Sequence, residues 1–421
     1  MNSPHTKPTP RFIQNVYLTL TLLNTLAASF IWGINTLFLL DAGLSNAEAF
    51  LANAFFTAGM MVFEIPTGLV ADLRGRRTSY LLGTVTLAVS TLAYLGAWMT
   101  QAPFWAWAVS SVLIGLGFTF FSGATEAWLV DALHFAEYKG EMDSVFGKGQ
   151  SVMGIAMLGG SVAGGWIAQF TNLGVPYMLR VVMLLATFLV GYIFMRDWGW
   201  TPEKSVNLRE DVRQLFKTSI DMGLRKPEIR WVMLAAPFAG GVGIYVFYAM
   251  QPHLLNLFGD PNAYGIAGLA AAIVAGAQIL GGLIAPAVRR LFPLRTSALL
   301  SAAVLNALLL FVLSRVTNFW LAVTLVAAWA LIFACVMPLR QAYLNERIPS
   351  KQRATVLSFD ALMSSSGGVV AQPVLGRVAD IGGYLQSFVV ASGIYALAVP
   401  LTLLAHRRNI SDTSKAEMDA T

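Results

Sequence analysis

Charge is scarce in this sequence of 421 residues. Asp, Glu, Lys and Arg together make up 12% of it, whereas a soluble domain carries about 25%. Hydrophobic residues make up 56%. A chain with so few charges cannot cover a water-exposed surface of its own size with polar groups, which excludes the ordinary soluble classes. We therefore predict a membrane protein.

Cysteine is almost absent, and so are the motifs of catalysis. The single cysteine, Cys335, lies inside an apolar stretch, which excludes an intrachain disulfide and is typical of a small packing residue. No phosphate-binding loop of the Walker type, metal-ligand cluster or nucleophile constellation is found in the sequence. We expect no enzymatic activity, no ATP drive, no cofactor and no metal. The alternating segments of a membrane barrel are missing as well, so the spans must be helices.

Long apolar stretches recur along the whole chain, each sufficient for a helix to cross a hydrocarbon core of about 30 Å. We predict twelve such spans. They cover residues 14–40, 47–71, 78–100, 103–134, 144–170, 175–196, 229–257, 264–288, 295–314, 318–346, 354–379 and 384–405.

The positions of the basic residues predict the orientation. With a cytoplasmic N-terminus, most of the 28 Lys and Arg residues lie on the inner side, and only Arg315 and Arg377 fall near the outer side. This bias places both termini in the cytoplasm, and we expect a bacterial inner membrane. The net charge of +6 requires no nucleic-acid partner, because the basic residues flank spans against an anionic leaflet.

The longest polar stretch divides the chain into two halves. We predict an N-terminal six-helix bundle over 1–196, a cytoplasmic linker over 197–228, and a C-terminal six-helix bundle with a cytoplasmic tail over 229–421. Within the linker, apolar residues recur at helical spacing, which indicates either an amphipathic surface helix or a solvated linker. These residues are Leu208, Val212, Leu215 and Phe216.

The two halves resemble each other in sequence. "EAWLVDAL" at 126–133 closes the fourth span and "QAYLNERI" at 341–348 closes the tenth, with Ala, an aromatic residue, Leu and an acid at equal spacing. Each is followed by a short polar loop and a span rich in small residues. Duplicated six-helix repeats around a site at the membrane midplane are one architecture of secondary transporters.

The loop between spans two and three carries the sequence "GLVADLRGRR" at 68–77. It resembles the signature of the major facilitator superfamily at this place, and Gly68, Asp72, Gly75, Arg76 and Arg77 match it. The resemblance, to twelve-span drug:proton antiporters in particular, covers nearly the whole chain. It implies two pseudo-symmetric six-helix bundles and a cytoplasmic latch at this loop, with Asp131 as the expected partner of the arginines. A basic turn that only sets topology is the alternative.

A second, degraded resemblance lies in span five. Antiporters of the superfamily carry a glycine-rich motif there, and "GSVAGG" supplies Gly160, Gly164 and Gly165, with Gly147 before them. Ser161 replaces the proline of that motif and Ala156 an earlier glycine. The match favours efflux modestly, and close packing of small residues explains it nearly as well.

Ionisable residues inside spans are costly and are therefore candidates for function. Five lie in one layer, roughly 7 to 12 Å from the inner surface, namely Glu64, Glu126, Lys148, Arg340 and Asp360. We expect Lys148 to pair with Glu126 and Asp360 with Arg340. The resemblance makes Glu126 and Arg340 the best cavity candidates. Glu64, which precedes Pro66, is either a protonation site or a local partner of backbone groups freed by the proline.

Polar and aromatic residues on the spans expected to line a central cavity suit an amphipathic organic ligand. The candidates are Asn24, Trp32, Asn35, Phe118, Phe121, Tyr245, Tyr248 and Gln251. Arg180 and His253, near outer span ends, are expected to be interfacial.

These observations predict a monomeric secondary transporter that works by alternating access. We expect proton-coupled efflux of small organic or drug-like compounds, with the lipid bilayer and protons as the other partners. The alternatives are proton-coupled uptake of a nutrient or organic anion, which Arg340 would favour, and a lipid flippase or sensor on the same fold.

Overall fold

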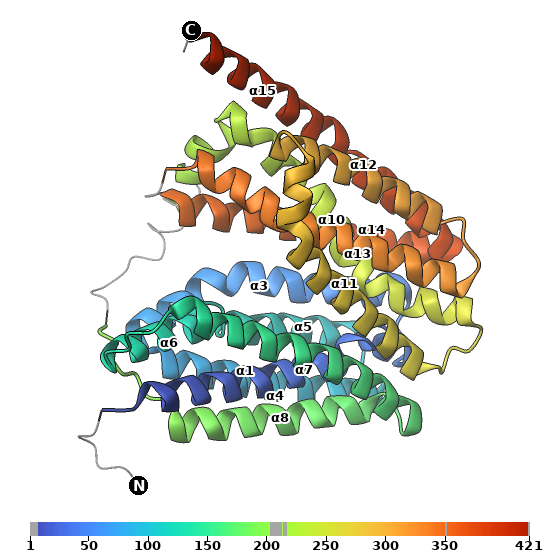
Figure 1. The fold of residues 1–421 in the computed structure, drawn as a ribbon. Helices are drawn as coiled ribbons and strands as arrows, with labels where there is room; N and C mark the ends of the chain where they lie inside the picture. Colours follow the sequence, from blue (N-terminus) through green and yellow to red (C-terminus); the bar gives the residue numbers. More distant parts are fainter. Residues whose placement is uncertain (1–6, 203–212, 214–216, 350–351, 420–421) are drawn as a thin grey trace. The chain divides into compact units, whose positions relative to one another are not determined.

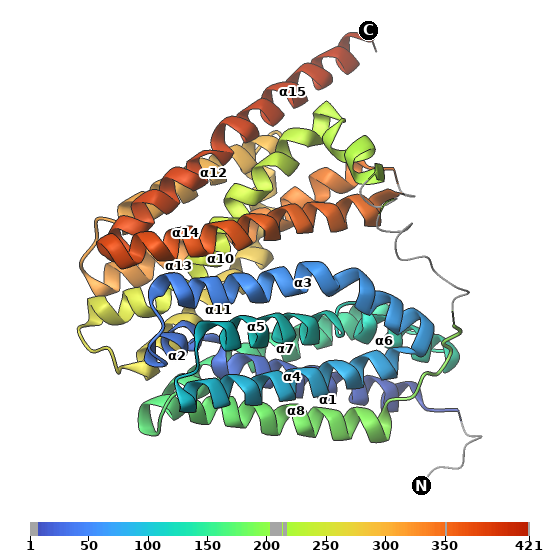
Figure 2. The same ribbon diagram turned by 180° about the vertical axis from the view of Figure 1, so that it is seen from behind.

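The computed structural model describes residues 7–202, 213, 217–349 and 352–419. Helices joined by short turns make up this part of the chain, and no strand occurs in it (Figures 1 and 2). Eleven of the described helices are long and apolar enough to cross a membrane. The protein is therefore an all-α membrane protein, as predicted.

The described residues of the first half form eight helices. Two of them, over Asn35–Asp41 and Ala124–Phe135, are short because two predicted spans are each broken into two helices. The break in span one falls at Gly33 and Ile34, and the break in span four falls at Phe120–Gly123, where Gly123 has φ 69°. The helices are α1 (Pro10–Trp32), α2 (Asn35–Asp41), α3 (Asn46–Arg74), α4 (Arg76–Thr100), α5 (Phe104–Thr119), α6 (Ala124–Phe135), α7 (Met142–Phe170) and α8 (Gly174–Phe194).

The second half begins with a short π-helix and continues with long helices. They are η1 (Ile220–Leu224), α10 (Pro227–Phe258), α11 (Tyr264–Leu291), α12 (Arg295–Leu313), α13 (Phe319–Arg347), α14 (Arg353–Ala396) and α15 (Ala398–Asp419). The last apolar helix runs over Thr355–Ile410, but Gly383 within it has φ 74° and ψ 176°, which no helical residue adopts. The helix is divided there, and this division gives the twelve crossings that the sequence predicts.

The described residues form two compact units. Unit 1 holds α1, α2, α3 from Phe55 onward, α4–α8, and Ala263–Ala272 at the start of α11. Unit 2 holds Leu44–Ala54, α10, α11 from Ile273 onward, and α12–α15. The apolar stripe predicted in the linker, Leu208 to Phe216, lies outside the described residues, so the linker helix stays a prediction.

In unit 1, α1 packs mainly against α7 and α8, and α4 packs against α5 and α8. Small residues allow the approach of α1 to α7. A methyl group at Gly164 would overlap the carbonyl oxygen of Phe30, and the Ser29 hydroxyl donates a hydrogen bond of 3.1 Å to the Ala156 carbonyl. The small residues of span five therefore act in close helix packing.

In unit 2, α10 packs along α14, and α12 packs against α13. One end of this unit is an apolar cluster that includes Ile229, Met233, Leu344 and Val356, all at most 2% exposed. Met222 and Leu224 of η1 pack against the same cluster. The described end of the linker is thus fixed to unit 2 by apolar contacts.

Candidate functional site

The two acidic residues predicted inside the membrane in unit 1 are both associated with the break in span four. Ser122, within the break, donates a hydrogen bond of 2.6 Å from its hydroxyl to Oε1 of Glu64. Glu126 lies in the first turn of α6, where backbone N–H groups without helical partners favour a negative charge. Both side chains are exposed. The break therefore presents two accessible carboxylates from α3 and α6.

Glu64 does not have the local role that was one of its two predicted roles. The hydroxyl of Thr67 donates to the carbonyls of Phe63 at 2.8 Å and Glu64 at 3.3 Å, whereas the carbonyl that Pro66 leaves without a helical donor is that of Val62. A threonine one turn later can reach back to these carbonyls, since its hydroxyl lies close to the preceding turn. The Glu64 carboxylate instead accepts a hydrogen bond from the Ser122 hydroxyl.

The predicted pairing of Lys148 with Glu126 is wrong. Within the described residues no ion pair joins them, and both side chains are exposed. The hydroxyl of Tyr17 on α1 packs so closely on Gly149 of α7, the residue after Lys148, that a methyl group there would overlap it.

The 68–77 motif forms a tight turn between α3 and α4. Gly75 has φ 100°, a conformation that residues with a Cβ atom rarely adopt. Arg76 forms an ion pair with Asp72 one turn earlier, and its Nε lies 3.9 Å from Oδ2 of Asp131. The contact expected between the arginines and Asp131 is therefore present, through Arg76.

Asp197, which is not among the predicted site residues, completes this turn. Its Oδ1 accepts a hydrogen bond of 2.8 Å from the backbone N–H of Arg77, at the start of α4. A methyl group at Gly75 would overlap the same carboxylate. The second glycine of the motif thus serves two needs, a positive φ and room for Asp197. In the sequence Asp197 is one acid just after span six, where nothing separates it from an ordinary loop acid.

Asp197 provides a test of this turn through its pH dependence. Burial raises the pKa of its carboxyl above 3.8 despite the backbone hydrogen bonds from Arg76 and Arg77. Since the folded pKa is raised, the stability contributed by Asp197 is largest at low pH and is lost as the pH rises through the folded pKa. Asp197→Asn keeps an oxygen acceptor without a charge, so at pH 7 it should unfold at the wild-type temperature or above.

Asp197→Ala is the matched variant for this test. It removes the acceptor at the start of α4 and should cost about 1 kcal/mol. Thermal unfolding in detergent micelles between pH 4.5 and 8 would measure both variants, and the advantage of Asn over Asp should shrink as the pH falls. Equal destabilisation by Asn and Ala at pH 7 would show that Asp197 acts through its charge instead.

The second half contains an equivalent of the Arg76–Asp131 contact. Arg295, the first residue of α12, forms an ion pair with Glu346 near the end of α13. Glu346 occupies the position in "QAYLNERI" that Asp131 occupies in "EAWLVDAL", and Arg76 is likewise the first residue of its helix. The loop 289–295 lacks the Asp and the glycines of the first half, yet the pairing of a basic helix start with an acid is retained.

Unit 2 contains the buried ion pair that the sequence predicts between Arg340 and Asp360. The Arg340 guanidinium contacts both carboxylate oxygens, with Nη2 2.6 Å from Oδ1, and Nη2 also donates to the Val232 carbonyl at 3.3 Å. The two side chains are 17% and 8% exposed. This bidentate pair connects α13, α14 and α10.

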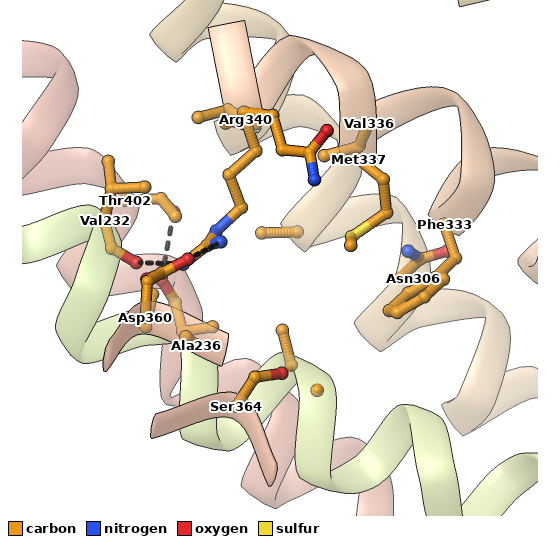
Figure 3. Close-up of a pocket in the computed structure, with 18 of the residues that line it drawn as sticks. Val232, Ala236, Asn306, Phe333, Val336, Met337, Arg340, Asp360, Ser364 and Thr402 are labelled. Atoms are coloured by element: carbon orange, nitrogen blue, oxygen red, sulfur yellow. Dashed lines mark hydrogen bonds and ion pairs between the residues drawn. The ribbon is translucent and has the colours of Figure 1, made fainter. Parts of the chain in front are cut away.

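The ion pair forms part of the wall of a cavity inside unit 2. The cavity has a volume of about 310 Å³ and is lined by residues of α10, α12, α13, α14 and α15. Figure 3 shows Arg340 and Asp360 on one side of the space and Asn306, Phe333 and Met337 on another. Most of the remaining wall is apolar, with several alanines.

None of the eight residues predicted to line a cavity is found in the wall of this one. Phe121 and Tyr245 are buried at 8% and 0%, because their rings pack on Tyr80 and Phe50 with centroids 4.8 Å apart in each case. Gln251 is also buried. Phe121 and Tyr245 therefore serve packing within their units. The others, which are partly buried, are Asn24, Trp32, Asn35, Phe118 and Tyr248.

The expectation that Arg180 and His253 are interfacial is wrong, since each is only 2% exposed. Arg180 donates from Nε to the Thr91 hydroxyl at 3.1 Å and lies over the ring of Phe118. His253 packs against Phe388, with ring centroids 4.9 Å apart. Both side chains point inward, although the sequence places them near the ends of their helices. The rotation of each helix about its axis decides this direction, and it cannot be predicted from the sequence alone.

The comparison with protein families settles the assignment. The sequence model of the Major Facilitator Superfamily matches residues 17–372. The chain belongs to this superfamily. An uncharacterised transporter of the major facilitator type from Bacillus subtilis, YxaM, is 21% identical over 408 residues, which cover 94% of this chain and 96% of the relative.

Solved structures of other transporters share the major facilitator fold. The nucleoside transporter NupG aligns with a TM-score of 0.73 and 11% identity over 94% of this chain and 99% of NupG. A bacterial homologue of the human lysosomal transporter Spinster aligns with a TM-score of 0.71 and 16% identity over 97% and 99% of the two chains. At these identities the likeness establishes the fold, and the substrate must be argued from the site.

Proposed function

We propose that this member of the major facilitator superfamily is a monomeric, proton-coupled exporter of small organic molecules in a bacterial inner membrane. Members of the superfamily are transporters, and alternating access is the mechanism that suits duplicated bundles around a midplane site. The spans offer carboxylates for proton coupling, and the sequence contains no motif that would support catalysis or ATP drive.

The observation that carries the proposal is the position of Glu64 and Glu126 at the break in span four. Both are exposed carboxylates within predicted spans, and neither forms an ion pair within the described residues. An ionised group at this depth is costly unless it faces water or a partner. The presence of two carboxylates here therefore indicates a role in proton or ion movement. A broken helix that carries polar groups is a common form of such a site.

Uptake of an organic anion is the second candidate, and it depended on a free positive charge at Arg340. The guanidinium is already held by both oxygens of Asp360, so it offers no net charge to an anion. This neutralisation favours export of cationic or neutral compounds over uptake of anions. A flippase or sensor function has no specific contact in its favour among the described residues.

Inverted membrane vesicles test the proposal directly. An imposed inward-acid gradient should drive ethidium or Nile red, as cationic and neutral amphipathic probes, into vesicles that contain the protein. Collapse of the gradient with a protonophore should release them. Movement that responds to anionic probes alone would favour uptake of anions, and competition by lipid head groups alone would favour a flippase.

Asp72 is proposed to act in the cytoplasmic latch, through its ion pair with Arg76. Asp72→Asn should reduce transport at least tenfold while expression and membrane insertion remain nearly unchanged, because it removes a charge contact made in one state of the cycle. Asp221→Asn is a matched control, since Asp221 forms an exposed ion pair with Arg225 at the same spacing in the linker. Normal transport by Asp72→Asn would contradict the latch.

A further inference from the structure

We propose that the cavity inside unit 2 binds small, electrically neutral, amphipathic organic molecules, and that these are among the substrates of the exporter. The claim that these molecules are substrates rests on the proposed function. The binding site itself rests on the cavity between Arg340, Asp360, Asn306 and Phe333 (Figure 3). It lies within one bundle and contains neither of the proposed proton-coupling carboxylates of unit 1.

The cavity is partly open, and its size suits a small organic ligand. An apolar cavity of about 150 Å³ already accepts benzene. The cavity here measures about 310 Å³. Its volume arises because alanines of α10 and α12 line it where larger side chains would fill the space, among them Ala236, Ala302 and Ala303.

The charges of the wall select a neutral ligand. Arg340 and Asp360 cancel each other, and no other charged side chain is among the lining residues. A charged ligand would lose its hydration without gaining a counter-charge, which is strongly unfavourable. A neutral ligand meets no such cost. The cavity should therefore discriminate against both cations and anions of the same size.

The placement of polar groups indicates an amphipathic ligand. The guanidinium has N–H groups beyond those bound by Asp360 and Val232, and the carboxylate oxygens have further acceptor capacity. A group that both donates and accepts, such as an amide, matches this side of the cavity. Phe333 and Met337 supply the apolar side, against which an aromatic or aliphatic body would pack.

Three matched probes test the selectivity. We would titrate 4-phenylbutanamide, 4-phenylbutylamine and 4-phenylbutanoate against the full-length protein in lipid nanodiscs, and follow binding by saturation-transfer NMR. The amide should bind at least tenfold more tightly than the amine and the carboxylate. Equal binding of the three probes, or no saturable binding of the amide, would overturn the inference.

Variants of the ion pair sharpen the test, because each single change leaves a net charge in the wall. Asp360→Asn should shift the preference to 4-phenylbutanoate, and Arg340→Gln should shift it to 4-phenylbutylamine. A purely structural ion pair would lower binding of all three probes without reversing their order. If a single variant fails to fold, the double variant Arg340→Gln with Asp360→Asn must still prefer the amide, and loss of that preference would count against the site.

A second pair of variants locates the binding. Ala303→Phe, or the milder Ala239→Leu, fills the cavity and should weaken amide binding at least tenfold. Leu305→Phe is the matched control on the same helix, since Leu305 is 49% exposed and does not line the cavity. Amide binding that survives both filled variants would place the ligand elsewhere and overturn the inference.

Transport assays separate this inference from the proposed function. Accumulation of the amide in inverted vesicles under a pH gradient, lost in Ala303→Phe, is expected if both hold. Binding of the amide with no gradient-driven transport of any probe would overturn the exporter and leave the site standing. Gradient-driven transport of ethidium without binding of the amide would overturn the site and leave the exporter standing.

Discussion

Glu126→Gln should abolish gradient-driven transport while gradient-free exchange of substrate persists. The variant keeps the size of the side chain and part of its hydrogen bonding at the first turn of α6 but cannot ionise. A carboxylate that exchanges a proton for substrate must change its proton affinity as its surroundings alternate between wet and dry. Glutamine cannot make this change. The coupling of proton movement to transport should therefore be lost, whereas the substrate-binding site should remain.

Two measurements check this result. Accumulation in inverted vesicles should fall at least tenfold to the protein-free level, and the proton release that accompanies substrate addition to the purified wild type should disappear. Glu137→Gln is the control, because Glu137 follows α6 closely, is exposed and pairs with Lys7 outside the predicted spans. If Glu126→Gln still concentrates substrate when pH alone drives it, Glu64 is the next candidate, through its contact with Ser122.

Arg340→Ala should destabilise the protein more than the double change Arg340→Ala with Asp360→Ala. The single change leaves a carboxylate that is 8% exposed without its partner, and removal of one member of a buried pair costs about 3–5 kcal/mol. The double change removes the stranded charge and should recover a large part of that loss. The pair thus offers the largest stability effect expected from a point substitution in unit 2.

Thermal unfolding of the single and double variants in one detergent would complete this cycle. A coupling energy of more than about 1 kcal/mol between the two sites indicates a direct interaction, whereas additive losses contradict it. Arg295→Ala with Glu346→Ala is a suitable comparison, since the acid of that pair is 53% exposed. That cycle should show a coupling of about 0–1 kcal/mol, as exposed ion pairs do.

The membrane class, the spans and the duplication could be predicted from the amino-acid sequence. These follow from local chemistry, because the length and polarity of each stretch decide whether it crosses a bilayer. The need for a turn at Gly75 was visible for the same reason. The pairing of Arg340 with Asp360 could also be predicted, since two opposite charges at equal depth in neighbouring spans have few other partners.

Which side chains contact one another depends on helix packing, and most of these contacts could not be predicted from the sequence. Glu126 and Lys148 have equal depth, yet no ion pair joins them among the described residues. Arg180 is buried because α8 turns it toward Thr91. The rotation of each helix depends on side-chain packing with neighbours distant in sequence, which hydropathy does not encode. The cavity beside Arg340 arises for the same reason, since alanines leave a space only where several helices turn them toward one another.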